Sequence, residues 1–239
     1  MLDSKFLFSF ERIEHHYKKA LENGYEVCTC REYVDRKSIG GSNKLIVNRV
    51  DIDVSVKRAE RLGVIYNRLG IKASFFIRLH ADYNPFSFEN YRILKGLVDA
   101  GHEIGYHSEV EDQAAIWDES AESCLLRDID VINRMFDVEL SGVASHGGFT
   151  GLNNLNFWKN KKASDFGLVY EAYDSDPSFD LFNNSFYISD SEWKQWKCYD
   201  RGKLLEGNRK TFGDHVDDGH ELIYLLIHSD TYYDKHIYE

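Results

Sequence analysis

Apolar residues recur along the chain in two alternating patterns, one with the period of a strand and one with the period of a helix. The run Lys44–Val50 has the length and β-branched content of a buried strand. Val54–Leu69 then shows helical spacing and ends at Gly70, and Ile71–Leu79 is again strand-like. This strand, helix, strand unit within about 35 residues is typical of a parallel sheet.

The same rhythm continues for another 70 residues or so. Further expected elements are a helix at Phe88–Ala100 capped by Ser87, a strand at His102–Tyr106, a helix over Glu111–Phe136 and a strand at Gly142–Ser145. Repeated strand and helix units predict the α/β class, as a (β/α) barrel or an open doubly wound sheet.

The two ends of the chain have weaker patterns. Expected there are a strand or extended arm at Phe6–Phe10, a helix at Ile13–Leu21, a helix at Asn153–Lys159, and strands at Phe166–Tyr173, Ser185–Ile188 and Glu221–Ile227. The stretch 191–217 fits no pattern. No linker or low-complexity segment interrupts residues 1–239, so a single domain is expected.

The composition limits the kinds of binding partner and the location that are expected. The net charge of −11 argues against nucleic acid or an anionic membrane as the main partner. No run approaches the roughly 18 apolar residues of a membrane span, and no signal-peptide pattern precedes the first helix, so a cytoplasmic protein is expected. Cys28 and Cys30 are spaced C-x-C in an expected strand and are interpreted as free thiols, as are Cys124 and Cys198. The oligomeric state is not determined by the sequence.

Two carboxylates close the Lys44–Val50 strand. Asp51 and Asp53 lie at i and i+2, so both point to one face of an extended chain. Like charges held together favour a cation or a shared proton nearby. An alternative is that Asp53 caps the helix that follows, although capping does not explain Asp51.

Three histidines also follow strands, where parallel α/β proteins carry catalytic groups. His107 and Glu111 are spaced i, i+4, so they can chelate one ion if the chain turns helical directly after the strand. If the segment stays extended, Glu109 is the alternative ligand. His146 precedes Gly147 and Gly148, and His228 ends the last strand. A mixed oxygen and nitrogen ligand set favours zinc, with manganese or cobalt as alternatives, and metal-assisted hydrolysis of an amide or ester.

These residues together resemble the polysaccharide deacetylase family, the NodB-like carbohydrate esterases. The resemblance lies in Asp51-Ile52-Asp53, in the segment Gly101–His107, and in the strand that ends at His228. More narrowly, the chain resembles a deacetylase-like branch associated with bacterial surface-polysaccharide clusters. Three departures stand out: Ile52 separates the aspartates, Glu111 replaces a histidine, and Ser145–Gly148 stands where the family has Arg-x-Pro-Tyr.

The resemblance implies a distorted (β/α) barrel that removes an acyl group from a small-molecule or lipid-linked N-acylated sugar. It assigns Asp51 as the base and His228 as the acid. Asp53 and His107 become metal ligands, with Glu111 at the position of the family's second histidine. Arg49, Glu109 and His146 are expected to contact the substrate, with Glu109 or His146 as the alternative to Glu111 for completing the metal site. The alternatives are another metal-dependent amidase on this scaffold and a non-catalytic carbohydrate-binding relative.

Overall fold

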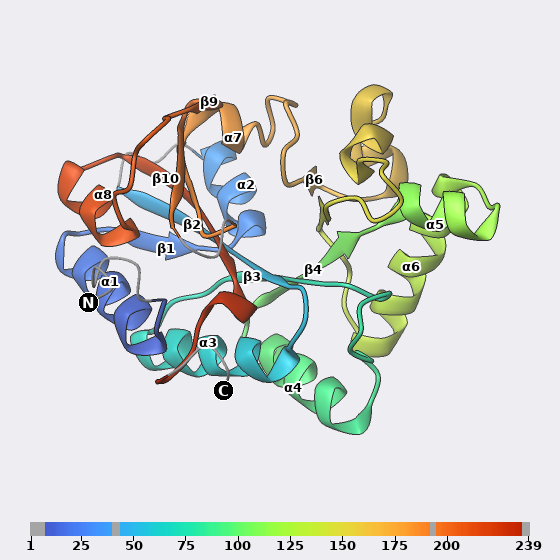
Figure 1. The fold of residues 1–239 in the computed structure, drawn as a ribbon, viewed down its shortest axis with the longest axis horizontal. Helices are drawn as coiled ribbons and strands as arrows, with labels where there is room; N and C mark the ends of the chain where they lie inside the picture. The colour runs from blue at the N-terminus through green and yellow to red at the C-terminus, as the bar shows by residue number, and fades with distance from the viewer. Residues whose placement is uncertain (1–7, 40–43, 192–194, 236–239) are drawn as a thin grey trace.

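One parallel-dominated sheet organises the part of the chain that the computed structural model describes, residues 8–39, 44–191 and 195–235 (Figure 1). The strands are β1 (Glu26–Cys28), β2 (Leu45–Ile52), β3 (Ser74–Ile77), β4 (Glu103–Ser108), β5 (Gly142–Ser145), β6 (Tyr170–Glu171), β7 (Phe186–Ser189), β8 (Lys197–Asp200), β9 (Lys203–Leu204) and β10 (Leu222–His228). Their order is β6-β5-β4-β3-β2-β10-β7-β8-β9, and β1 pairs with the first half of β2. Among the described strands, only the β7–β8 and β8–β9 pairs are antiparallel.

The predicted α/β fold class is therefore confirmed. Within the described residues β6 and β7 do not pair with each other, so the barrel is open on that side and distorted. The register places His228 beside Asp51, and His107 beside Ala144. Parallel pairing brings the carboxyl ends of β2, β4, β5 and β10 to one edge, as the sequence pattern predicted.

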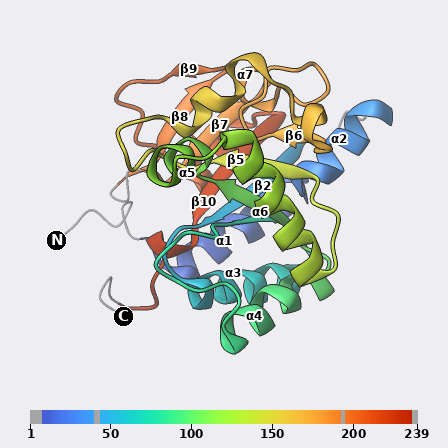
Figure 2. The same cartoon turned by 90° about the vertical axis from the view of Figure 1, so that its right-hand side faces the viewer.

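The helices are α1 (Phe10–Glu22), α2 (Cys30–Ile39), α3 (Val56–Leu69), α4 (Phe88–Asp99), α5 (Val110–Trp117), α6 (Ala121–Phe136), α7 (Leu181–Asn184) and α8 (Phe212–Asp218), with 3₁₀ turns at Asn154–Asn160, Ala163–Phe166 and Ser229–Thr231. Helices α3 and α4 lie next to each other along one side of the sheet (Figures 1 and 2). None of the described helices has the length and apolar character needed to cross a membrane.

Two apolar clusters occupy the two faces of the sheet. Ile46, Val50 and Ile52 of β2 pack in the cluster that includes α1, α3, α4 and α6. Val47, one position out of phase, packs in the other cluster with Phe76 and Tyr224. Because successive strand residues alternate between faces, the inner face that carries Val47 also carries Arg49 and Asp51.

Some sequence predictions fail locally. The predicted helix Glu111–Phe136 is two helices, because Asp118 adopts a left-handed conformation (φ 55°) that ends α5. Cys30 does not lie in a strand but begins α2, where its N–H donates to Ser74 Oγ (2.8 Å). Of the arm expected at Phe6–Phe10, residues 6 and 7 lie outside the described part, and Phe10 begins α1.

Candidate metal-dependent active site

Three potential ligands meet at the carboxyl edge of the sheet. Asp53, His107 and His146 each offer an atom within 4.8 Å of the others, and His107 Nε2 lies 3.4 Å from Asp53 Oδ1. Asp53 follows β2, His107 belongs to β4, and His146 follows β5. The rings of His107 and His146 meet edge to face, with centroids 5.0 Å apart.

The candidate ligand atoms of this cluster face one another and make few other hydrogen bonds. His107 Nδ1 donates to Ala144 O (2.8 Å), so Nε2 is the ring nitrogen that faces Asp53. Asp53 Oδ1 and His146 Nδ1 are buried and make no hydrogen bond among the described residues; their nearest charged neighbours are His107 Nε2 (3.4 Å) and Glu109 Oε1 (3.2 Å), respectively. Tetrahedral zinc places its ligand atoms about 3.3 Å apart, close to the 3.4 Å between Asp53 and His107. These residues fit a divalent first-row metal ion.

Hydrogen bonds with Asn154 and Asp112 hold the loop that carries His146 at this edge of the sheet. Asn154 Nδ2 donates to His146 O (3.2 Å), and Asn154 Oδ1 accepts from Glu111 N (2.9 Å). Asp112 accepts from Phe149 N and Thr150 N, and so ties the same loop to α5. The backbone after β5 is therefore fixed against α5, with His146 at the strand end.

Glu111 lies outside this cluster. The chain becomes helical only at Val110, after β4 has ended at Ser108, so His107 and Glu111 do not share a helical face. The sequence favoured Glu111 only if the chain turned helical at His107, and this condition is not met. The role of Glu111 as a metal ligand stays a prediction, which the structure does not favour.

Asp51 is bound by a buried arginine from its own strand. Arg49 Nε and Nη2 donate to Asp51 Oδ1 (2.8 Å) and Oδ2 (2.7 Å), and the guanidinium lies over the rings of Phe76 and Tyr173. Burial would raise the pKa of Asp51, but Arg49 and His107 outweigh burial and hold that pKa below its ordinary value. Asp51 is therefore ionised at neutral pH. Contact of Arg49 with a substrate stays a prediction.

His228 is paired with a buried carboxylate at the same edge. His228 Nδ1 lies 2.6 Å from Asp190 Oδ1, and the backbone N–H of His228 donates to both oxygens of Asp190 (3.0 Å). Its other ring nitrogen, Nε2, is 4.0 Å from Asp53 Oδ2. Burial lowers the pKa of His228, but the nearby carboxylates, with Asp190 foremost, raise it to about 9. His228 is therefore protonated at neutral pH and aimed at the cluster.

We expect Asp190→Asn to lower the pKa of His228 in the metal-free protein from about 9 toward its ordinary value of 6.5. Asparagine keeps the shape of Asp190 but removes the charge that favours imidazolium. Because the folded-state pKa is raised, the pair stabilises the fold fully below about pH 6.5, and this contribution is lost as pH rises through about 9. Titration of the His228 ring by NMR measures the shift. An unchanged pKa in the variant would contradict the assignment.

Glu109 belongs to a chain of contacts behind the cluster. Arg78 Nη2 donates to Glu109 Oε1 (2.6 Å), and Arg78 Nη1 donates to Asp53 O (3.1 Å). His146 Nδ1 lies 3.2 Å from the same Glu109 oxygen. Arg78 and Glu109 therefore hold the backbone of one candidate ligand and the ring of another. Contact of Glu109 or His146 with a substrate stays a prediction.

The structure rejects helix capping as the role of Asp53. The N-cap of α3 is Ser55, and Asp230 Oδ2 accepts from Asp53 N (3.2 Å) and Val54 N (2.9 Å). Sequence reasoning gave no role to three residues of the site: Arg78, Asp190 and Asp230. Each lies just past a strand, and that position was the one signal available for them.

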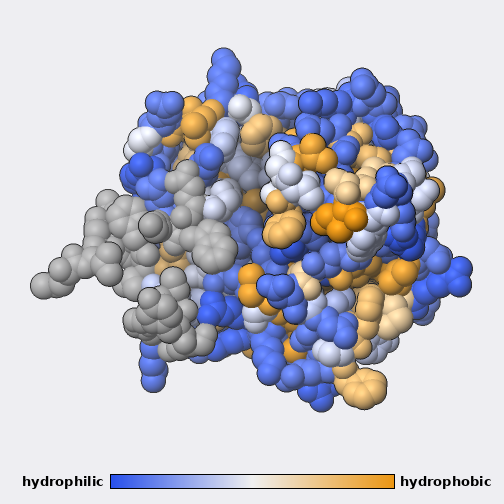
Figure 3. Space-filling view, turned by 45° about the vertical axis from the view of Figure 1, so that its right-hand side comes forward, coloured by the Kyte–Doolittle hydropathy of each residue, from blue (hydrophilic) through white to orange (hydrophobic). Residues whose placement is uncertain are grey.

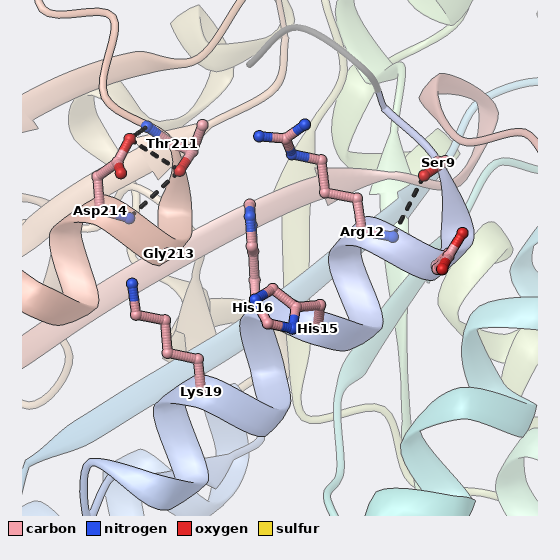
Figure 4. Close-up of a pocket in the computed structure, with 9 residues that line it drawn as sticks. Ser9, Arg12, His15, His16, Lys19, Thr211, Gly213 and Asp214 are labelled. Atoms are coloured by element: carbon pink, nitrogen blue, oxygen red, sulfur yellow. Dashed lines mark hydrogen bonds between the residues drawn. The ribbon is translucent and has the colours of Figure 1, made fainter. Parts of the chain in front are cut away.

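A cavity elsewhere does not belong to this site. About 540 Å³ in volume, it lies between α1 and the start of α8 and is lined by Arg12, His16 and Asp214 among others (Figure 4). None of the strand-end residues described above lines it. In the view of Figure 3 the surface is mostly hydrophilic, with hydrophobic side chains in small, separated groups.

Comparisons with known proteins give only distant likenesses. No family model and no curated protein matches the chain. Among solved structures, similar ones are a mutant CE4 family pseudoenzyme with restored enzymatic activity (16% identity, 80% of this chain, TM-score 0.47), the wild-type pseudoenzyme from Bacillus anthracis (16%, 80%, 0.47), and the chitin deacetylase from Colletotrichum lindemuthianum (11%, 79%, 0.44). This chain spans 60%, 58% and 74% of their respective lengths. The α/β class follows from the chain's own sheet, and these likenesses carry nothing about activity.

Proposed function

We propose that this chain is a metal-dependent hydrolase that removes an acyl group from the nitrogen of an acylated sugar. The observation that carries the proposal is the placement of two proton-transfer groups beside one ligand cluster. Asp51 lies 3.2 Å from His107 Nε2, and His228 Nε2 lies 4.0 Å from Asp53. An ionised acceptor and a protonated donor at one centre suit amide hydrolysis, because the leaving amine needs a proton.

Asp53, His107 and His146 are the residues that would hold the cation. A divalent metal ion bound there supplies Lewis acidity toward an acyl carbonyl and lowers the pKa of water. Asp51 takes the proton of the attacking water, with Arg49 fixing the carboxylate. His228 delivers a proton from Nε2 to the departing nitrogen, and Asp190 keeps the ring oriented and charged.

The substrate class is the finer part of the proposal. It draws on the resemblance of Gly101–His107 and of the strand-end aspartates to the polysaccharide deacetylases. We infer an N-acetylated sugar carried on a nucleotide or a lipid, as a precursor in the biosynthesis of a surface polysaccharide, in the cytoplasm. Zinc is the expected metal.

The test is acetate release from N-acetylated sugar nucleotides and glycolipids by protein loaded with zinc, manganese or cobalt. We expect release by the loaded protein and none after chelation. Metal-dependent release of a product other than acetate would replace the proposal with a different amidase. A protein that neither contains nor takes up metal at this edge would replace it with a non-catalytic carbohydrate-binding role.

A further inference from the structure

A second group of histidines and a carboxylate lies where α8 passes into β10. His215 is on α8, Asp218 ends that helix, and His220 precedes β10. His215 Nδ1 lies 3.4 Å from Asp218 Oδ2, and His220 Nε2 lies 4.0 Å from the same oxygen. Gly219 makes this convergence possible, since its left-handed conformation (φ 76°) reverses the chain between the two histidines.

Both imidazole rings are held in place by packing. His220 stacks on Phe186 of β7 with ring centroids 3.8 Å apart, and His215 packs on the same ring at 4.4 Å. His215 Nε2 lies 3.3 Å from Cys198 Sγ, a weak acceptor for an N–H, which leaves Nδ1 to face Asp218. The rings are therefore positioned before any ligand arrives.

His215 Nδ1 and His220 Nε2, the two nitrogens that face Asp218, make no hydrogen bond in the described residues. His215 is only 1% exposed. A buried polar atom without a partner is costly, so native proteins seldom leave two of them aimed at one carboxylate. One ligand that accepts electron pairs from all three groups would satisfy them together.

We propose that His215 Nδ1, Asp218 Oδ2 and His220 Nε2 form a second site for a divalent first-row metal ion. Two imidazoles and a carboxylate are common zinc ligands, and all three candidate atoms lie within 4.8 Å of one another. The site lies before β10 begins, whereas the candidate active site lies where β10 ends at His228. The metal joins α8 to β10 at the amino end of the strands, where stabilising rather than catalytic groups are found in barrels of this kind.

Lys210 competes with a metal ion for Asp218. Its exposed ammonium group lies 2.7 Å from both oxygens of that carboxylate. Removing this charge frees Asp218 Oδ2 for a cation. Lys210→Met is therefore expected to tighten metal binding roughly fivefold, the scale of a surface ion pair.

The experiment measures zinc binding by equilibrium dialysis and metal analysis, with Zn²⁺ alone as the probe. Asp218→Asn and His220→Asn are each expected to bind one zinc ion fewer per chain than the wild type. His15→Asn, which removes an exposed histidine on α1, is the matched control and is expected to bind as the wild type does. Zinc is also expected to raise the melting temperature of the wild type more than that of Asp218→Asn, which keeps only the active-site metal.

NMR resonances of the His215 and His220 rings report on the second site alone. They therefore distinguish metal binding at this site from metal binding at the candidate active site. Shifts of both rings on addition of Zn²⁺ support the second site even if Asp53→Asn binds as much zinc as the wild type, an outcome that would count against the first. Equal zinc content in the wild type, Asp218→Asn and His220→Asn, with unmoved His215 and His220 signals, would overturn the second site. An equal loss in His15→Asn would also overturn it.

Discussion

Asp51→Asn is expected to lower kcat/KM for acyl release by roughly 10²- to 10⁴-fold, the contribution of a positioned general base. Asparagine preserves the size of the side chain and its place beside Arg49, but it cannot take a proton. Asp51 is 1% exposed and lies at the end of β2 next to the ligand cluster. Steady-state kinetics with a metal-loaded protein measure the effect.

Metal content separates a lost base from a lost metal. Asp51→Asn is expected to retain the metal ion of this site, whereas Asp53→Asn is expected to lose both that ion and the activity, because Asp53 Oδ1 faces the cluster and makes no hydrogen bond in the described residues. Wild-type activity in Asp51→Asn with metal retained would show that this carboxylate is not the base.

Arg49→Met is expected to lower the free energy of unfolding by about 3–5 kcal/mol, the usual effect of breaking a buried ion pair. Arg49 and Asp51 are each 1% exposed, so the variant leaves a buried carboxylate without its bidentate partner. Methionine fills part of the space between Phe76 and Tyr173 but donates no hydrogen bond. Urea denaturation followed by circular dichroism measures the change.

Two further variants make this prediction sharp. Arg92→Met also removes one positive charge, but from an exposed position on α4, and is expected to change stability by less than about 0.5 kcal/mol. The double variant Arg49→Met with Asp51→Asn is expected to be more stable than Arg49→Met alone, because the unpaired buried charge is gone. A loss in Arg49→Met no larger than in Arg92→Met would mean that the pair contributes little to the fold.

The strand ends were the predictable part of this protein. Alternation in the Lys44–Val50 run placed Asp51 and Asp53 on one face, and parallel pairing then brought His107 and His228 to the same edge. These predictions rest on local periodicity and on one rule of parallel sheets. The α/β fold class followed from the same information.

The partners of these residues were not predictable, because they depend on contacts between distant segments. Asp190 meets His228 across 38 positions of sequence, and Arg78 meets Glu109 across 31. The choice between Glu111 and Glu109 as a ligand depended on where α5 begins, and helix boundaries are weakly encoded in the sequence. The break between α5 and α6 at Asp118 was equally unpredictable. It needs one residue in a left-handed conformation, and an Asp in the sequence does not indicate that it adopts one.

The location of the metal ion is the most direct test of the central claim. Crystals of the zinc-loaded protein, measured at the zinc absorption edge, are expected to show an anomalous peak about 2 Å from Asp53, from His107 Nε2 and from a ring nitrogen of His146. Glu111→Gln is expected to keep this peak and His146→Asn to weaken or lose it. A wild-type structure with no peak between these three residues, or with the peak on Glu111, would contradict the account.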